Sequence, residues 1–384
     1  MTGRSDPRPM LIMVMLAVVF AAALSVRFSD AVALLTGGTE APAQEPTPSP
    51  SPTAPPPEVT FDHETCCEQA ARFLDVKWTS DQPVTAASVR VEPAPPFECA
   101  ATVAPSGRGG TLGCAGFLPG AVDHVATLTV TTAAGRYPAA HRFRTMGDRL
   151  DGVKWFTEFE DPTGTPLACA AASCRIVQLY TAGEDKMTAT EILALGQQFN
   201  KSTDPGLDPV AIATVLDRLE AGNDYHYYRF DTRQDATAAA VYWLFRSGKP
   251  VIAITLAGQH APLVIGFDGA YGTYYDDPSN KIDGVIVMDP QRGDLRPETN
   301  RRPDKYRTAE FQTGRLLALE EWYGDEWWLR FAYSREIRVA GRLVNIERND
   351  DAYPLPHWVG KFVLLVDDGD TEWPPESEGR VRFR

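Results

Sequence analysis

A cysteine, a histidine and an aspartate stand in an order that suits nucleophilic chemistry. Cys169 follows a proline-rich turn and opens an alanine-rich segment with helical apolar spacing. Unpaired backbone N–H groups and the helix dipole favour an anion at a helix N-terminus, so a thiol there is biased toward thiolate. His260 stands at the start of the second of two apolar runs that indicate buried strands, and Asp289 ends a third. The set predicts a thiolate nucleophile, an imidazole base and a carboxylate that fixes the ring's tautomer.

Three short motifs around these residues resemble papain-fold cysteine peptidases related to the bacteriocin-processing peptidases. They are Cys169-Ala-Ala-Ala-Ser, similar to a Cys-Trp-Ala-Ala-Ser helix start, His260-Ala-Pro-Leu-Val, similar to a Gly-His-Ala-Val strand, and Val-Met-Asp289-Pro, similar to Val-Leu-Asp-Pro. Ala170 replaces the family's usual tryptophan. The resemblance covers residues 151–296 and implies a bacterial α+β papain-like cysteine peptidase. In it Cys169 attacks the scissile carbonyl, His260 transfers the proton and Asp289 orients the imidazole.

One part of that resemblance is absent. Papain-like peptidases place a glutamine shortly upstream of the nucleophile as an oxyanion donor, whereas this chain has no Gln or Asn between Gln82 and Cys169. A carboxylate there would repel the oxyanion unless protonated, while a threonine hydroxyl or the backbone N–H of Cys169 could donate. The nearest polar candidates are Glu158, Glu160, Asp161, Thr163 and Thr165.

The sequence therefore leaves two functions open. One is an extracytoplasmic peptidase that hydrolyses peptide bonds through a Cys-His-Asp triad. The other is a catalytically inactive, peptidase-like surface-binding protein, in which Cys169 is a small buried residue, His260 a core histidine and Asp289 a cap at a strand end. The expected partner is a peptide or protein in both cases.

The N-terminal residues 10–26 form an apolar run flanked by arginines. A helix that rises ~1.5 Å per residue would cover about 25 Å here, near the lower limit for crossing a bilayer. The cleavage-like motif Ala31-Val-Ala33 lies too far beyond the run for a usual signal peptide. We predict residues 1–38 to be a membrane anchor or signal segment, with anchoring favoured. The chain would be a single-pass cell-membrane protein with its domains outside, or secreted if cleaved.

The rest of the chain divides by composition into three parts. Residues 39–58 are a proline-rich linker. Residues 59–148 carry short alternating apolar runs between turn signals, which predict an all-β sandwich. This part resembles a fibronectin type III or immunoglobulin-like module, with His124 where that family usually has a corner tyrosine. Residues 149–384 would be the papain-like domain with a C-terminal β extension.

Caps, breakers and apolar periodicity predict the elements of the papain-like domain. The expected helices are residues 169–183, 188–199, 208–222 and 235–248. The expected strands are residues 251–256, 260–267 and 282–289, followed by 327–333, 337–346 and 358–366. The last three strands either complete the sheet or form a separate β unit.

The spacing of the cysteines limits the possible disulfides, and the net charge limits the possible partners. Six cysteines in an exported chain suggest disulfides, and Cys99 and Cys114 bracket a predicted hairpin. Cys169 and Cys174 on one helix would have Cα atoms ~8–9 Å apart, beyond disulfide reach, so Cys169 should remain a thiol and Cys174 a packed residue. The net charge of −14 without a basic stripe argues against nucleic acid.

No cofactor and no metal are expected. One acidic turn could offer oxygen ligands to Ca²⁺, but its spacing fits no EF-hand loop, and a solvated turn is favoured. Its residues are Asp276, Asp277, Asn280 and Asp283.

Overall fold

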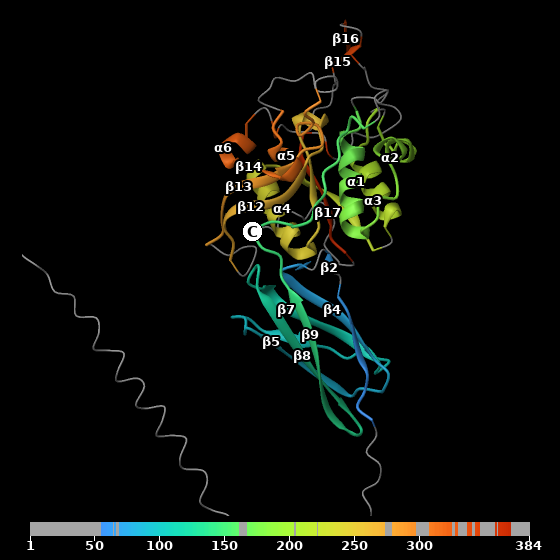
Figure 1. The fold of residues 1–384 in the computed structure, drawn as a ribbon, viewed down its shortest axis with the longest axis vertical. Helices are drawn as coiled ribbons and strands as arrows, with labels where there is room; N and C mark the ends of the chain where they lie inside the picture. Colours follow the sequence, from blue (N-terminus) through green and yellow to red (C-terminus); the bar gives the residue numbers. More distant parts are fainter. Residues whose placement is uncertain are drawn as a thin grey trace, which may run out of the picture. The chain divides into compact units, whose positions relative to one another are not determined.

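The structure is a computed structural model of the chain, and its described residues fall within one compact unit, Ala54–Arg384. They are residues 55–63, 65–66, 69–160, 167–202, 205–220, 222–272, 279–296, 307–324, 327–328, 336–339, 342–345, 358 and 360–369. The predicted membrane segment and almost all of the predicted linker lie outside them. Within them, no helix has both the length and the apolar character needed to cross a membrane. They form a mixed α+β protein with six helices and several sheets (Figure 1).

The first half of the described chain consists of antiparallel strands. One sheet has the order β1-β4-β7-β6, with bounds Val59–Asp62, Phe73–Ser80, Gly109–Phe117 and Cys99–Ala101. A second has the order β5-β8-β9, with bounds Ala86–Glu92, Asp123–Thr132 and Gly135–Arg144. A short pair is formed by β2 (Thr65–Cys66) and β3 (Gln69–Ala70). Alternate residues of both larger sheets enter one core, with Val76 and Trp78 from β4 and Leu128 and Val130 from β8.

Two sequence expectations can be located in these sheets. The predicted Cys99–Cys114 disulfide is present, and it joins directly opposed residues of β6 and β7. His124, expected at the position of a corner tyrosine, is 1% exposed, and its Nε2 lies 3.3 Å from the carbonyl oxygen of Pro119. The imidazole thus contacts backbone a few residues upstream.

A six-stranded sheet lies at the centre of the second half. Its order is β10-β17-β11-β12-β13-β14, with bounds Tyr225–Phe230, Phe362–Asp367, Val251–Ile254, Leu263–Ala270, Lys281–Met288 and Arg315–Ala318. Strand β17 comes from near the C-terminus, yet it pairs with β10 on one side and β11 on the other. The C-terminal β segment therefore completes this sheet. A separate hairpin is formed by β15 (Glu336–Val339) and β16 (Arg342–Asn345).

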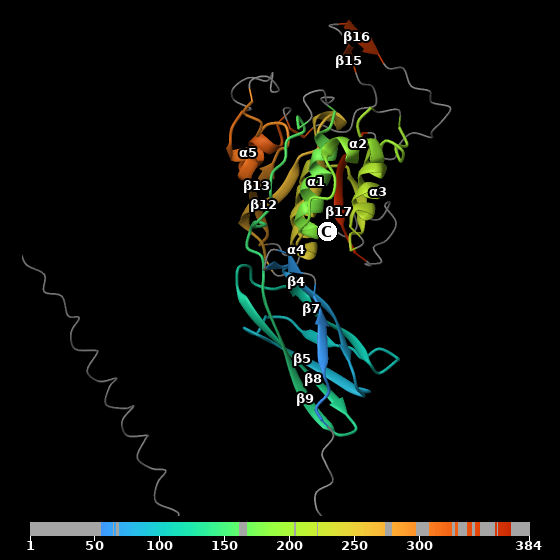
Figure 2. The same ribbon diagram turned by 45° about the vertical axis from the view of Figure 1, so that its right-hand side comes forward.

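Helices bury both faces of that sheet (Figure 2). One face packs against α1 (Cys169–Ala182), α2 (Ala189–Gly196) and α3 (Pro209–Leu219), and the other against α4 (Arg233–Ser247). Successive residues of β17 alternate between the two cores, with Val363 and Leu365 facing α1–α3 and Leu364 and Val366 facing α4. Because both faces of the sheet are covered, a central strand such as β17 carries apolar residues on both faces and shows no alternation in its sequence. The one-turn helices α5 (Glu310–Thr313) and α6 (Leu319–Trp322) lie beside β13 and β14.

Three helix boundaries differ from the predictions. α2 ends at Gly196 rather than at residue 199, because the N–H groups of Gln198 and Phe199 bond three residues back, as in a 3₁₀ turn. α3 ends at Leu219 rather than near Gly222, where the extended Glu220 breaks the helix. α4 begins earlier than predicted because the Thr232 hydroxyl, and not Asp235, is the N-cap acceptor.

The predicted strands also need correction. β10 is absent from the predicted strands, because its residues are aromatic and polar and include no run of aliphatic residues. β11 ends at Ile254, where the chain leaves the sheet for a turn. Trp327 and Trp328 are not in a strand but pack as buried side chains near Trp322, and residues 329–335 lie outside the described ranges.

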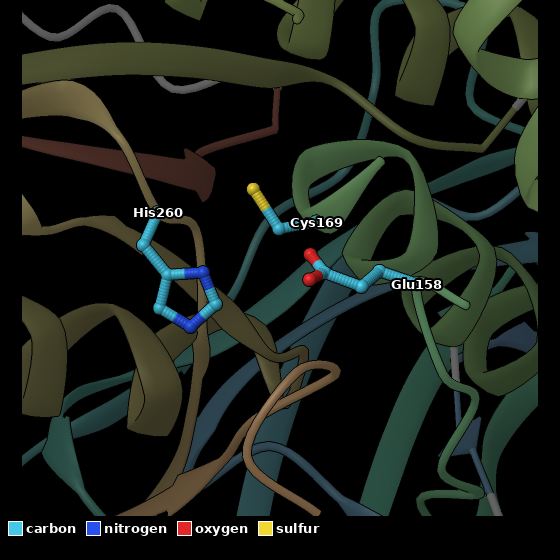
Figure 3. A group of neighbouring side chains, drawn as sticks. All are labelled: Glu158, Cys169 and His260. Carbon is cyan, nitrogen blue, oxygen red and sulfur yellow. The ribbon is translucent and has the colours of Figure 1, made fainter. Parts of the chain in front are cut away.

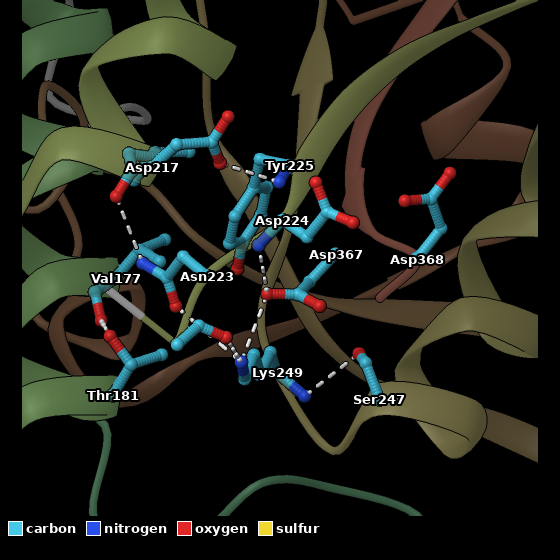
Figure 4. Close-up of polar contacts among 12 residues, drawn as sticks. Val177, Thr181, Asp217, Asn223, Asp224, Tyr225, Ser247, Lys249, Asp367 and Asp368 are labelled. Atoms are coloured by element: carbon cyan, nitrogen blue, oxygen red, sulfur yellow. Dashed lines mark hydrogen bonds and ion pairs between the residues drawn. The ribbon is translucent and has the colours of Figure 1, made fainter. Parts of the chain in front are cut away.

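A buried ion pair joins three strands at one end of this sheet (Figure 4). Lys249 precedes β11 and Asp367 ends β17, and their side chains are 5% and 7% exposed with Nζ and Oδ2 2.9 Å apart. Lys249 Nζ also donates to the carbonyl oxygen of Gly222 and the side-chain oxygen of Asn223, at 3.2 and 3.4 Å, before β10. The lysine thus links segments far apart in the sequence.

Replacing Lys249 by methionine should lower the free energy of unfolding by about 3–5 kcal/mol, because Asp367 would remain buried without its cation. Urea denaturation measures this. Lys281→Met is the matched control, since its ion pair with Asp283 is 71% and 46% exposed, and it should cost less than about 1 kcal/mol. Equal losses for the two variants would contradict the role given to the buried pair.

Candidate active site

Cys169 is the first residue of α1, as the sequence predicted. The preceding residue, Ala168, supplies no side-chain cap, and the first helical turn contains no acidic residue. Among the described residues, no side chain therefore caps this helix end in competition with a thiolate. The Cys169 side chain is partly buried, and its Sγ lies 3.9 Å from the carbonyl oxygen of Gln259. The thiol can thus be reached, and it lies at the N-terminal end of α1, where the backbone N–H groups favour a negative charge.

His260 is held by a strained turn between β11 and β12. Leu256 and Ala257 have φ values of 50° and 59°, in the left-handed region that is costly for residues other than glycine. The turn is closed by the bond from the Thr255 N–H to the His260 carbonyl, 2.8 Å, and the Leu256 N–H donates to Trp327 at 2.8 Å. His260 was predicted to begin the strand, but β12 begins at Leu263. The histidine belongs to the turn instead.

Asp289 holds the imidazole in one orientation. It follows the last residue of β13, it is 0% exposed, and its Oδ1 lies 2.9 Å from Nε2 of His260. The same oxygen accepts the backbone N–H groups of Gln291 and Arg292 at 2.8 and 2.9 Å. With Nε2 turned to the carboxylate, Nδ1 is the nitrogen left to face the thiol. Among the described residues, Nδ1 has no hydrogen-bond partner.

The charge of Asp289 is set by its buried neighbours. Burial acts to raise the pKa of Asp289, but the charge of His260, its hydrogen bond and the Arg292 guanidinium outweigh burial and hold that pKa below its ordinary value. Arg292 Nε lies 3.4 Å from Oδ2, and its guanidinium stacks 3.7 Å from the ring centroid of Trp327. Asp289 therefore stays ionised around neutral pH and can stabilise a protonated His260.

The structure brings Cys169, His260 and a third residue, Glu158, together (Figure 3). The sulfur, one ring nitrogen and one carboxyl oxygen all lie within 4.8 Å of one another. Glu158 is 3% exposed, its N–H donates to the carbonyl of Pro290 at 3.1 Å, and its Oε1 accepts from the Gln291 side chain at 2.5 Å.

Glu158 was one of five polar residues that the sequence offered as a substitute for the absent glutamine. Of the other four, Glu160 pairs with Arg175, and Asp161, Thr163 and Thr165 lie outside the described residues. The hydrogen bond from the Glu158 N–H to the Pro290 carbonyl places Glu158, among these five candidates, beside the thiol. That contact is tertiary, so no local sequence signal could have distinguished it.

Two neighbours of Cys169 on α1 have separate places in the structure. The Ser173 hydroxyl donates to the carbonyl of Ala261 at 2.5 Å and so ties the nucleophile helix to the segment that follows His260. Cys174 is fully buried, and burial raises the pKa of its thiol. The prediction that Cys174 is a packed residue is confirmed.

An apolar hollow lies beside the thiol. It is shallow, open to solvent, and bordered by Cys169 and His260. Its walls come from the start of α1, the segment before α3, the end of β11 and the turn to β12. Apart from Cys169 and His260, the lining residues carry no ionisable side chain; they are Leu167, Ala170, Gly206, Leu207, Pro209, Ile254, Gly258, Gln259 and Ala261.

Distances alone do not define a metal centre. A thiol, an imidazole and a carboxyl group within 4.8 Å satisfy the spacing of a nucleophile and its base equally well. A second group, Asp224, His226 and Asp368, is equally close. There the hydrogen bond with Asp368 is the main cause that raises the pKa of His226 to about 9, and a protonated imidazole does not bind metals.

The acidic turn that could bind Ca²⁺ is described only in part. Asp276 and Asp277 lie outside the described residues, while Asn280 accepts the Gly272 N–H at 2.6 Å. That the protein needs no metal stays a prediction.

Comparison with known proteins does not assign this chain to a family. No protein-family model matches the chain, and no curated protein matches it. The interpretation of the site therefore depends on the distances, burial and charges of its own residues.

Iodoacetamide should modify Cys169 in the folded protein below pH 7, where an ordinary thiol with a pKa of ~8.5 reacts slowly. Cys174 should react only after denaturation, because it is fully buried. Mass spectrometry of the two peptides over time gives both rates. His260→Ala should slow Cys169 at least ~10-fold below pH 7, since an opposite charge favours the thiolate. Equal protection of both cysteines in the folded protein would rule out an accessible nucleophile.

Proposed function

We propose that the chain is a papain-like cysteine peptidase that hydrolyses peptide bonds outside the cell membrane. The observation that carries this proposal is the convergence of three side chains from separate elements. The Cys169 sulfur lies within 4.8 Å of a ring nitrogen of His260, and the Nε2 of that ring lies 2.9 Å from the buried carboxylate of Asp289.

The first half-reaction uses the thiol and the imidazole as a pair. His260 takes the Cys169 proton on Nδ1, and the thiolate attacks the carbonyl carbon of the peptide bond, so that a C–S bond forms. The backbone N–H groups at the start of α1 would donate to the oxygen that gains the charge. When the tetrahedral intermediate collapses, the C–N bond breaks and the Nδ1 proton passes to the leaving amine.

The second half-reaction returns the enzyme to its starting state. Water enters in place of the amine, His260 removes a proton from it, and the hydroxide adds to the thioester carbon. The C–S bond then breaks, and the proton goes back to Cys169. Asp289 keeps its charge throughout and stabilises the imidazolium at each stage.

The rest of the fold is consistent with an exported peptidase. A nucleophile helix packs on an antiparallel sheet, with the histidine in the turn before β12 and the acid directly after β13, and this arrangement is consistent with the predicted papain-like domain. The Cys99–Cys114 disulfide is the kind of bond that persists in oxidising compartments. The β-stranded half would act as a fibronectin type III-like spacer between the membrane segment and the peptidase.

One observation favours a second candidate, an inactive peptidase-like protein that holds a peptide without cutting it. Glu158 stands beside the thiol in place of a neutral donor, and a carboxylate there would repel both the thiolate and the oxyanion. The binding groove would then be the apolar hollow beside Cys169. Cleavage assays decide between the two.

Cys169→Ala should abolish cleavage of a mixed peptide library, because no other described thiol is placed to attack. Asp289→Asn should lower kcat by about 10²–10⁴-fold, since the imidazole would lose the charge that stabilises its protonated form. Mass spectrometry of the digested library measures both effects. Circular dichroism must show that the variants remain folded. Cleavage that survives in Cys169→Ala would contradict the proposed nucleophile.

The hollow predicts a preference for substrates with an apolar side chain close to the scissile bond. Leu207→Lys should lower kcat/KM for such peptides by about 10–200-fold, the range of discrimination typical of an apolar pocket. Leu316→Lys is the matched control, since Leu316 is 49% exposed on β14, and it should leave kcat/KM unchanged. If Leu207→Lys behaved like this control, the hollow would not be the substrate pocket.

A further inference from the structure

We propose that Trp327 is a positioning residue of the site, because its carbonyl holds the turn that carries His260 while its indole holds the guanidinium that contacts Asp289. This inference rests on the proposed peptidase function. Trp327 is not among the groups that attack or transfer a proton, so it acts on the reaction through the base and the acid. One residue thereby joins the two segments whose side chains must meet.

The first contact is made by the Trp327 backbone. Its carbonyl oxygen accepts the N–H of Leu256 at 2.8 Å. Leu256 is the first of the two non-glycine residues in this turn with a positive φ, and such a conformation persists only where neighbouring contacts hold it. The Thr255 N–H bonds to the His260 carbonyl and closes the turn. The Trp327 carbonyl therefore fixes the turn at the residue where its strain begins.

The second contact is made by the Trp327 indole. The Arg292 guanidinium lies 3.7 Å from its ring centroid, well inside the ~6 Å over which a cation is attracted to an aromatic face. Arg292 Nε in turn lies 3.4 Å from Oδ2 of Asp289. The other oxygen, Oδ1, lies 2.9 Å from Nε2 of His260. The indole thus helps to keep the two carboxylate oxygens with different partners.

Burial strengthens this second contact. Trp327, Arg292 and Asp289 are 1%, 2% and 0% exposed. Water therefore screens the attraction between the guanidinium and its two neighbours very little, and a cation–π contact is stronger when it is desolvated. Arg292 is held by an aromatic ring and by a carboxylate, and both are shielded from solvent.

Trp327 is itself held by an aromatic cluster. Its ring centroid lies 5.7 Å from that of Phe311 and 5.9 Å from that of Trp322. Its N–H donates to the Gly324 carbonyl at 3.0 Å. The Phe311 carbonyl also accepts the Asp289 N–H at 3.4 Å. The position of Trp327 is thus fixed relative to the acid on which it acts.

The adjacent tryptophan, Trp328, supplies a matched control. It is 0% exposed, and its ring centroid lies 4.7 Å from that of Trp322 on α6 and 5.8 Å from that of Phe362 on β17. Replacing either tryptophan by leucine removes a buried ring of the same size, so the two changes should cost similar amounts of stability. The Trp327 change also removes the ring on which Arg292 stacks.

The test measures how fast iodoacetamide modifies Cys169 in the full chain between about pH 4 and about pH 9, a range that spans carboxyl, imidazole and thiol ionisation. An imidazole that is less firmly held stabilises the thiolate less, so Trp327→Leu should slow the modification at least ~10-fold below pH 7. Trp327→Phe keeps an aromatic face, and its profile should lie between those of wild type and Trp327→Leu. The profile of Trp328→Leu should follow that of wild type.

Arg292→Lys is the second variant. It keeps a positive charge beside Asp289 but loses the planar group that stacks on the indole, so its profile should shift in the same direction as that of Trp327→Leu. Because the charge is conserved, such a shift reports a change of position. The titratable groups that face the thiol, Glu158 and His260, are the same in every variant.

Peptide cleavage separates positioning from substrate binding. In Trp327→Leu, kcat should fall at least ~10-fold while KM changes less than ~2-fold, because the reacting groups are misplaced and the hollow beside the thiol keeps its lining residues. Urea denaturation should show similar losses of stability for Trp327→Leu and Trp328→Leu.

Identical alkylation profiles for wild type and Trp327→Leu would overturn the inference and leave the peptidase standing. Equal shifts in Trp327→Leu and Trp328→Leu would also overturn it, since the effect would then be a general loss of packing. If Trp327→Leu does not fold, an unshifted profile for Arg292→Lys overturns it. A wild-type chain that cleaves no library peptide would refute the peptidase, while the alkylation profiles would still decide whether Trp327 positions His260.

Discussion

The site depends on one buried hydrogen bond, between Nε2 of His260 and Oδ1 of Asp289, 2.9 Å apart. It decides which ring nitrogen faces Cys169, and it keeps a negative charge next to the imidazole. Two backbone N–H groups and Arg292 hold the carboxylate, and the Trp155 indole donates to the Asp289 carbonyl at 2.7 Å. A buried charge without such partners would be strongly unfavourable. The surrounding sheet and helices therefore supply the partners that allow this carboxylate to be buried with its charge.

That assembly joins distant parts of the chain. The strand that leads to the His260 turn, β11, pairs with β17 from near the C-terminus, and Lys249 and Asp367 secure the far end of the same strands. On the other side, Ser173 fixes α1 against the segment after His260. The strained turn at Leu256 and Ala257 persists because these neighbours hold it. The positions of Cys169 and His260 relative to each other thus depend on contacts throughout the domain.

Some features of the fold and the site could be predicted from the sequence, because they depend on residues that are neighbours in the chain. Cys169 could be placed at a helix start by its flanking residues, and the Cys99–Cys114 pair by the hairpin between them. What could not be predicted depends on contacts between remote segments. The sequence does not show that β17 enters between β10 and β11, nor that Glu158 meets Pro290 and thereby reaches the thiol. The helix predicted over residues 235–248 begins earlier in the structure, because Thr232 and not Asp235 is its N-cap.

The proposed reaction requires that Cys169 and His260 form an ion pair in the folded protein. The ultraviolet absorbance of the thiolate, taken as the difference between wild type and Cys169→Ser across pH, measures it directly. An ion pair gives a thiolate signal well below pH 7 that disappears in His260→Ala. A signal that arises only at pH ~8.5, the ordinary pKa of a cysteine thiol, and is unaffected by His260→Ala would contradict this ion pair.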